Sequence, residues 1–81
     1  PIFADLAEQF NVDSVNRIKP GIAEATRAVL RRVPDHVFVR ATDDPDVALL
    51  VGLAREKGIA VTEMGAQLGQ YRAVTIIKKV L

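Results

Sequence analysis

The sequence predicts an α/β domain, built as a three-layer α-β-α sandwich around a small mixed sheet. Amphipathic helical patterns alternate with short apolar runs along the 81-residue chain, and one of these runs is continuous. A continuous apolar run is typical of a strand covered on both faces by helices. Hydrophobic residues make up 49% and charged residues 26% of the chain, as in ordinary soluble domains. We expect one domain over residues 1–81, because so short a chain has room for one core.

The first 14 residues predict a helix and a turn. Four apolar residues recur at helical spacing: Ile2, Phe3, Leu6 and Phe10. The turn formers of 11–14 end this helix. The next segment, 15–19, is ambiguous, with a possible short strand near Val15, and Pro20 favours an extended end.

The pattern predicts a second helix from Gly21 to about Arg32, which Pro34 and Asp35 end. Its expected buried residues share one stripe: Ile22, Ala25, Val29 and Val33, with Leu30 alongside.

Two further elements follow in the middle of the chain. Residues 36–41 predict a buried strand, because Val37 to Val39 is an unbroken apolar run. Asp44 and Pro45 are typical of a helix start, and Lys57 with Gly58 of a helix end. The stripe expected to face the core is Val47, Leu50, Val51 and Ala54.

The last third of the chain predicts two strands, over 59–64 and 73–81, separated by a loop or helical turn at 65–69. Lys78 and Lys79 indicate fraying or a sheet edge at the end of the final strand.

Several chemistries are excluded or disfavoured. The chain has no cysteine, one histidine and one serine, so thiol chemistry is excluded, and a metal site or a serine triad is not expected. Helix capping accounts for most of the acidic loop Asp43, Asp44 and Asp46. The pattern Gly65-x-x-x-Gly69 lacks the Lys-Ser/Thr of a phosphate loop. No apolar run approaches membrane length, and we expect a cytoplasmic protein without cofactor or metal.

An enzymatic alternative rests on Pro1, whose secondary amine could act as a general base in a tautomerase. Such an enzyme needs Pro1 at the start of a strand. The helical spacing of the following residues argues against that placement.

The segment around the second helix start combines features that suit RNA. Glu24, Arg27 and Arg31 share one helix face, opposite the apolar stripe. Gly21 allows close backbone approach, and the helix start offers free N–H groups to a phosphate. Lys19 adds charge nearby, while the Glu24 carboxylate can accept from base amino groups.

Residues 19–28, Lys-Pro-Gly-Ile-Ala-Glu-Ala-Thr-Arg-Ala, resemble the signature of ribosomal kink-turn-binding proteins, often called the L-seven-Ae family. That signature runs roughly Lys-x-Gly-x-Asn-Glu-x-Thr-Lys-Ala. Later pieces are similar in the same order, so the resemblance covers residues 15–81, with 1–14 as an N-terminal helix and turn. The asparagine of the signature is Ala23 here, and two later loops are shorter than usual.

The resemblance implies a non-enzymatic domain that binds RNA at sharp bends with sheared G·A pairs. It implies base contacts from Gly21 and Glu24 and a backbone contact from Arg27. The loop Met64, Gly65 and Ala66 would cover a flipped-out nucleotide. The implied partners are structured, kinked RNA and other proteins of a ribonucleoprotein.

A second hypothesis keeps the same fold but replaces RNA binding with protein contacts. The near-neutral net charge of +1 and the loss of the signature asparagine favour it. The contact surface would be the edge 74–81 or the helix 2–10.

Overall fold

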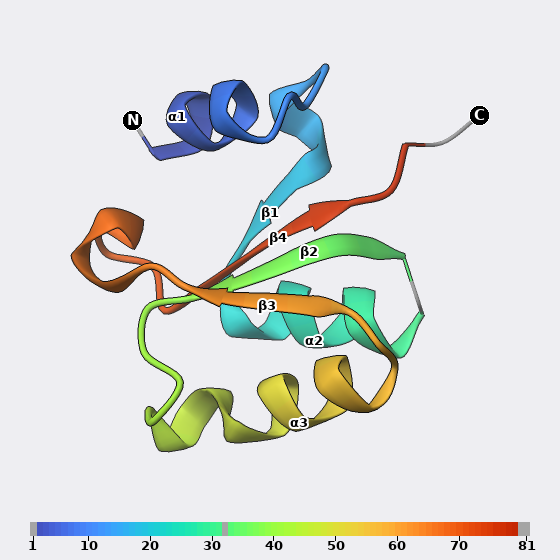
Figure 1. Ribbon diagram of the computed structural model, residues 1–81, viewed down its shortest axis with the longest axis vertical. Coiled ribbons are helices and arrows are strands. Elements are labelled where there is room, and N and C mark those ends of the chain that lie inside the picture. The colour runs from blue at the N-terminus through green and yellow to red at the C-terminus, as the bar shows by residue number, and fades with distance from the viewer. Residues whose placement is uncertain (1, 32, 80–81) are drawn as a thin grey trace.

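The computed structural model describes residues 2–31 and 33–79. Its helices and strands are α1 (Ile2–Gln9), β1 (Ile18–Pro20), α2 (Ile22–Leu30), β2 (Pro34–Val39), α3 (Ala48–Glu56), β3 (Ala60–Glu63) and β4 (Ala73–Ile77). Short 3₁₀ turns are η1 (Val15–Arg17), η2 (Pro45–Val47) and η3 (Gly65–Leu68). Figure 1 shows α1 on one face of the sheet and α2 with α3 on the other. The predicted three-layer α-β-α sandwich is therefore confirmed.

The sheet is mixed, with strand order β1-β4-β2-β3. β2 runs parallel to β3, and β4 runs antiparallel to both of its neighbours, β1 and β2. β4 therefore lies inside the sheet, and the expectation of an edge at 74–81 is wrong over 74–77, the part that β4 covers. The edges are β1 and β3. Residues 80 and 81 lie outside the described part of the chain.

The buried residues form two clusters, one on each face of the sheet, and the side chains of β2 point alternately into one and the other. Val37 and Val39 pack with α2 and α3 in one cluster of buried residues, and Phe38 packs in the other. The first cluster contains Ala25, Val29, Val37, Val39, Val47, Leu50, Val51, Ala54 and Ala73. The second contains Leu6, Ile18, Phe38, Leu68, Val74 and Ile76. The continuous apolar run was thus interpreted correctly.

Residues 15–19, ambiguous in sequence, divide into a turn and a strand. The Ser14 side chain accepts a hydrogen bond from the Asn16 N–H at 3.2 Å and caps η1. The strand then begins at Ile18, three residues later than the strand expected near Val15, because η1 occupies the residues between.

The expected stripe of α2 is wrong at its end. Leu30 is 58% and Val33 37% exposed, whereas Ala28 is buried. Leu30 follows Val29 by about 100° around the helix axis, which turns it away from the sheet. The helix also ends at Leu30, so Val33 no longer continues its periodicity.

The hydroxyl of Thr75 in β4 is a buried polar group that costs stability. Thr75 is 0% exposed, and its Oγ1 has no hydrogen-bond partner among the described residues. An unsatisfied buried hydroxyl costs about 1–3 kcal/mol. We expect Thr75→Val to raise the free energy of unfolding by about 1 kcal/mol and Tm by about 4–8 °C. Thr62→Val is the matched control. The Thr62 Oγ1 lies 2.6 Å from His36 Nε2 and is already hydrogen-bonded, so this variant should not gain stability.

His36 makes stability depend on pH. Its ring stacks on Phe38 with centroids 4.4 Å apart, and burial lowers the pKa of His36 below its usual 6.5. The unfolded chain therefore binds a proton at His36 more readily than the folded chain does. The free energy of unfolding is highest above pH 6.5 and falls as the pH drops from there toward the lowered pKa. Denaturant unfolding at pH 7.5 and 5.5 should show this loss, and His36→Phe should remove it. An equal loss in the variant would contradict the assignment to His36.

Candidate nucleic-acid interface

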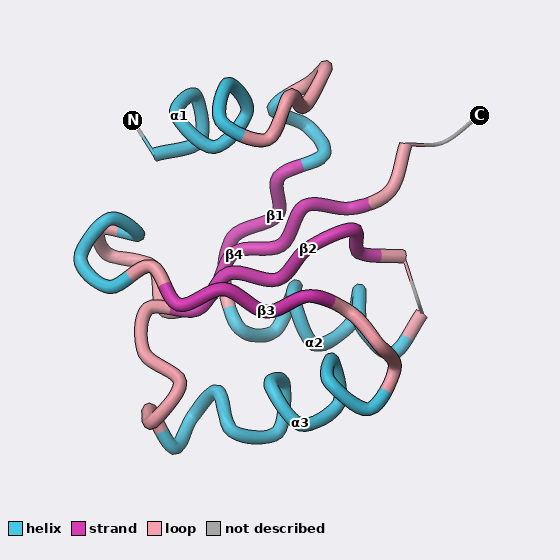
Figure 2. The backbone as a smooth tube through the Cα atoms, viewed as in Figure 1, coloured by secondary structure: helices cyan, strands magenta, loops and turns pink. Residues whose placement is uncertain are grey.

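The start of α2 and the turn η3 lie at the same end of the sheet, as Figure 2 shows. The Gly21 N–H donates to the Ala73 carbonyl at 2.8 Å, and Ala73 is in register with Val39. The Met64 N–H donates to the Val39 carbonyl, also at 2.8 Å. Three interstrand steps of about 4.8 Å therefore separate Gly21 from Met64, a span of roughly 15 Å. We call this end of the sheet, from Gly21 to η3, the platform.

Gly21 is the N-cap of α2 and has a φ of +99°, in the region that L side chains rarely adopt. No side chain caps this helix. The N–H groups of its first turn can therefore donate hydrogen bonds to an anion, as helix N-termini commonly do.

The predicted residues of β1 and α2 are brought together. A small cleft of about 120 Å³ is lined by Lys19, Glu24, Arg27, Ala28, Arg31, Val33 and Ile77. Arg27 Nη2 donates to Glu24 Oε1 in an exposed ion pair. Such a pair is worth only about 0.2–0.5 kcal/mol, so a phosphate or a base can displace it.

The predicted loop contacts lie on η3, at the other end of the platform. Met64 is half-buried against the α1-side core, Gly65 begins η3, and Ala66 is exposed. The Gly65 N–H donates to the Arg40 carbonyl at 2.9 Å, which holds η3 beside the end of β2.

Two arginines that the sequence analysis did not single out as RNA contacts lie between these parts. Arg40 directly follows β2, and its Nη1 donates to the Gly69 carbonyl at 2.7 Å. Arg72 precedes β4 and pairs with Asp44 and Asp46, each with a contact at 2.7 Å. For Arg40, the sequence signal was a basic residue directly after the buried strand β2.

The charges of the platform are mixed. The Arg72 guanidinium donates to Asp44 and lowers the pKa of that carboxyl, and the Thr42 N–H and hydroxyl lower the pKa of Glu63. Both groups are therefore ionised at neutral pH. Lys19 and Arg40 lie near the platform and have no ion-pair partner among the residues described. Arg31 also has none among them, but it is the C-cap of α2 and lies toward the opposite end of the sheet. The platform therefore has unpaired cations beside β1 and β2 and paired carboxylates beside the start of α3.

The structure also bears on the other chemistries that were considered from the sequence. No group of three or more potential metal ligands occurs within residues 2–31 and 33–79. None of the helices in these ranges has the length and apolar character to cross a bilayer. Pro1 lies outside the described residues, and Ile2 begins a helix rather than a strand.

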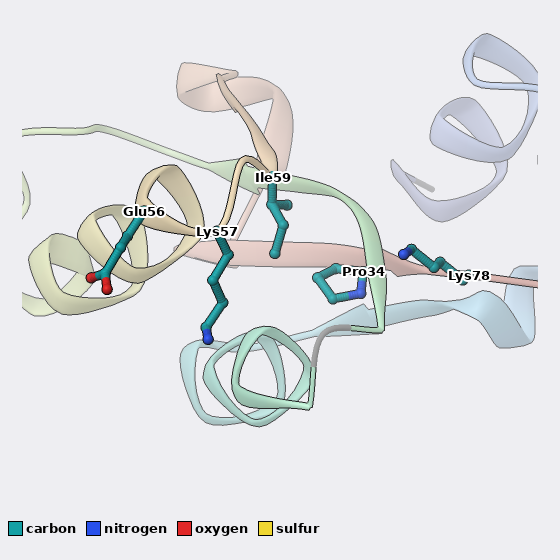
Figure 3. Close-up of a pocket in the computed structure, with 5 residues that line it drawn as sticks. All are labelled: Pro34, Glu56, Lys57, Ile59 and Lys78. Carbon is teal, nitrogen blue, oxygen red and sulfur yellow. The ribbon is translucent and has the colours of Figure 1, made fainter.

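A pocket of about 440 Å³ lies at the opposite end of the sheet. Figure 3 shows Pro34 and Ile59 between the side chains of Lys57 and Lys78, with Glu56 nearby. The pocket contains none of the predicted site residues.

Comparison with known proteins defines the class. The chain belongs to the PELOTA RNA-binding domain family, whose model matches residues 2–79. Its fold is similar to that of a 15.5kD RNA binding protein of Giardia lamblia, with a TM-score of 0.65 and 25% identity. That likeness covers 80% of this chain and 63% of the other. The resemblance to RNA-binding proteins of this type is therefore confirmed.

A curated relative is the cysteine protease StiP of Acinetobacter baylyi, which is 50% identical over 74 residues. The match covers 91% of this chain and 19% of that protein. The chain thus spans about a fifth of the length of this relative.

Proposed function

We propose that this domain binds RNA at a sharp bend, with the platform as its contact surface. The observation that carries the proposal is the placement of the α2 start and η3 at one end of the sheet. A straight duplex presents regular grooves, whereas a bend exposes base edges and brings phosphates of separate segments together. Two contact points roughly 15 Å apart can engage both sides of such a bend.

Each predicted residue has a role in this proposal. Lys19, Arg27 and Arg31 bind phosphates, because they are cations around one cleft that runs along α2 from the platform side toward Arg31 at the far end of the helix. Gly21 and the Glu24 carboxylate contact base edges, and the free N–H groups of the first turn of α2 donate to a phosphate. Met64, Gly65 and Ala66 cover an unpaired nucleotide. Arg40 lies between the start of α2 and η3.

The domain supplies binding rather than peptide cleavage. A cysteine protease needs a thiolate nucleophile, and these 81 residues contain no cysteine. We propose that, in a longer protein, this domain brings RNA to whatever activity the remaining chain carries.

The protein-contact hypothesis loses residues 74–77 of its predicted edge surface. β4 is paired on both sides, and so offers no free edge between Val74 and Ile77. On the other predicted surface, helix α1, the apolar side chain of Leu6 is fully buried in the core and cannot contact a partner.

The test compares a kink-turn RNA with a straight duplex of equal length across a salt series. We expect tighter binding of the kinked RNA and a log–log salt slope of about −3, from about four phosphate contacts. Equal, weak affinity for both RNAs would contradict the proposal.

A further inference from the structure

An aromatic groove lies beside the platform, between the start of α1 and the segment that leads from η3 into β4. The rings of Phe3 and Tyr71 stack with centroids 5.3 Å apart and planes 25° apart. The groove has a volume of about 470 Å³. Its lining residues are Ile2, Phe3, Asp5, Gln67, Leu68, Gly69, Gln70 and Tyr71.

The chemistry of this groove suits a nucleobase. Both rings are half-buried, so each retains surface that a planar group can contact. Gln67 and Gln70 are exposed, and neither amide has a side-chain hydrogen bond among the described residues. Proteins that read unpaired nucleotides stack bases on aromatic rings and bond base edges with polar side chains. Asp5 supplies an acceptor for base amino groups.

The groove is continuous with the platform. A neighbouring hollow is lined by Ile2, Asp5, Gln9, Met64 and Gln67, so it shares residues with the groove and reaches Met64. At the rim, Arg40 Nη1 donates to the Gly69 carbonyl at 2.7 Å, which places a cation beside the groove. The polar rim and this continuity favour a nucleotide over an apolar protein segment.

We propose that an unpaired base of the bound RNA stacks on Tyr71 in this groove, with Gln67 and Gln70 contacting its edge. The proposal rests on the proposed function, because it takes the RNA from the platform into the groove. It adds a second unpaired-nucleotide site, on the α1 side of η3, to the contacts of Met64 to Ala66.

The test uses a kinked RNA with 2-aminopurine at an unpaired position next to the bend, and the same RNA with an abasic site there. Stacking on Tyr71 should quench the fluorescence on binding. Tyr71→Ala should abolish the quenching and weaken binding about 5- to 160-fold, the range of one base–aromatic stack. Tyr71→Phe should retain both, and the abasic RNA should bind equally to all three proteins.

Unchanged binding and quenching in Tyr71→Ala would overturn the groove, while kinked-RNA binding by the platform would stand. Failure of the unaltered protein to prefer kinked RNA would instead overturn the proposed function, and the groove proposal with it. If Tyr71→Ala does not fold, the NMR signals of the Tyr71 ring in the unaltered protein show whether a base stacks on it. An upfield shift on RNA addition supports stacking, whereas shifts that depend on protein concentration alone indicate a second copy in the groove and contradict it.

Discussion

Replacing Arg27 by glutamate should weaken the binding of kinked RNA by about 10- to 160-fold. A charge-assisted hydrogen bond to phosphate contributes about 1.5–3 kcal/mol, and the new carboxylate would repel the same phosphate. The salt slope should become shallower by about one to two, because at least one phosphate contact is lost. Fluorescence anisotropy at several salt concentrations measures both quantities.

The matched control is Arg55→Glu, which makes the same charge change in the exposed last turn of α3. Arg55 lies toward the end of the sheet opposite the platform, so its reversal should change affinity only slightly. Arg27 is itself exposed, and we expect its replacement to change the free energy of unfolding by about 0.5 kcal/mol or less. Equal losses of affinity in the two variants would show that net charge governs binding and would remove the platform from the account.

Replacing Phe38 by alanine should have the largest effect on stability. Phe38 is 0% exposed, and its ring lies 4.8 Å from that of Phe10 and 4.4 Å from that of His36, measured between centroids. Removing such a ring leaves a cavity and costs about 3–5 kcal/mol. A domain of this size has a total stability of roughly 4–12 kcal/mol, so Tm should fall by more than about 12 °C.

Val15→Ala serves as the control for Phe38→Ala, because Val15 is 53% exposed in η1. The free energy of unfolding of Val15→Ala should differ from that of the unaltered protein by about 0.5 kcal/mol or less. Denaturant unfolding of both variants provides the comparison. A loss below about 1 kcal/mol in Phe38→Ala would show that the α1-side cluster is not a packed core.

Much of the fold could be predicted because its elements have strong local signals. The apolar run Val37 to Val39 identified β2, and Asp44 with Pro45 located the start of the η2–α3 segment. The central position of β4 could not be predicted, because hydropathy along a strand does not reveal its neighbours. Lys78 and Lys79 suggested an edge, yet they lie beyond the last paired residue, Ile77.

The candidate site divides in the same way. Glu24, Arg27 and Arg31 could be grouped from sequence, because helical spacing places them on one face. Arg40 and Arg72 are 32 positions apart in sequence and become neighbours only through the pairing of β2 with β4, where the Arg40 N–H donates to the Arg72 carbonyl at 3.0 Å. The stacking of Phe3 on Tyr71 likewise joins opposite ends of the chain and has no local signal.

A titration of the isotopically labelled protein with kink-turn RNA, followed by amide NMR, tests most directly whether α2 and η3 act together. The account predicts that signals of Gly21, Glu24 and Arg27 shift in parallel with those of Gly65 and Ala66, while Arg55 and Gly58 stay unmoved. Shifts confined to one of the two segments, or strongest around Lys57 and Lys78, would contradict a shared RNA-binding platform.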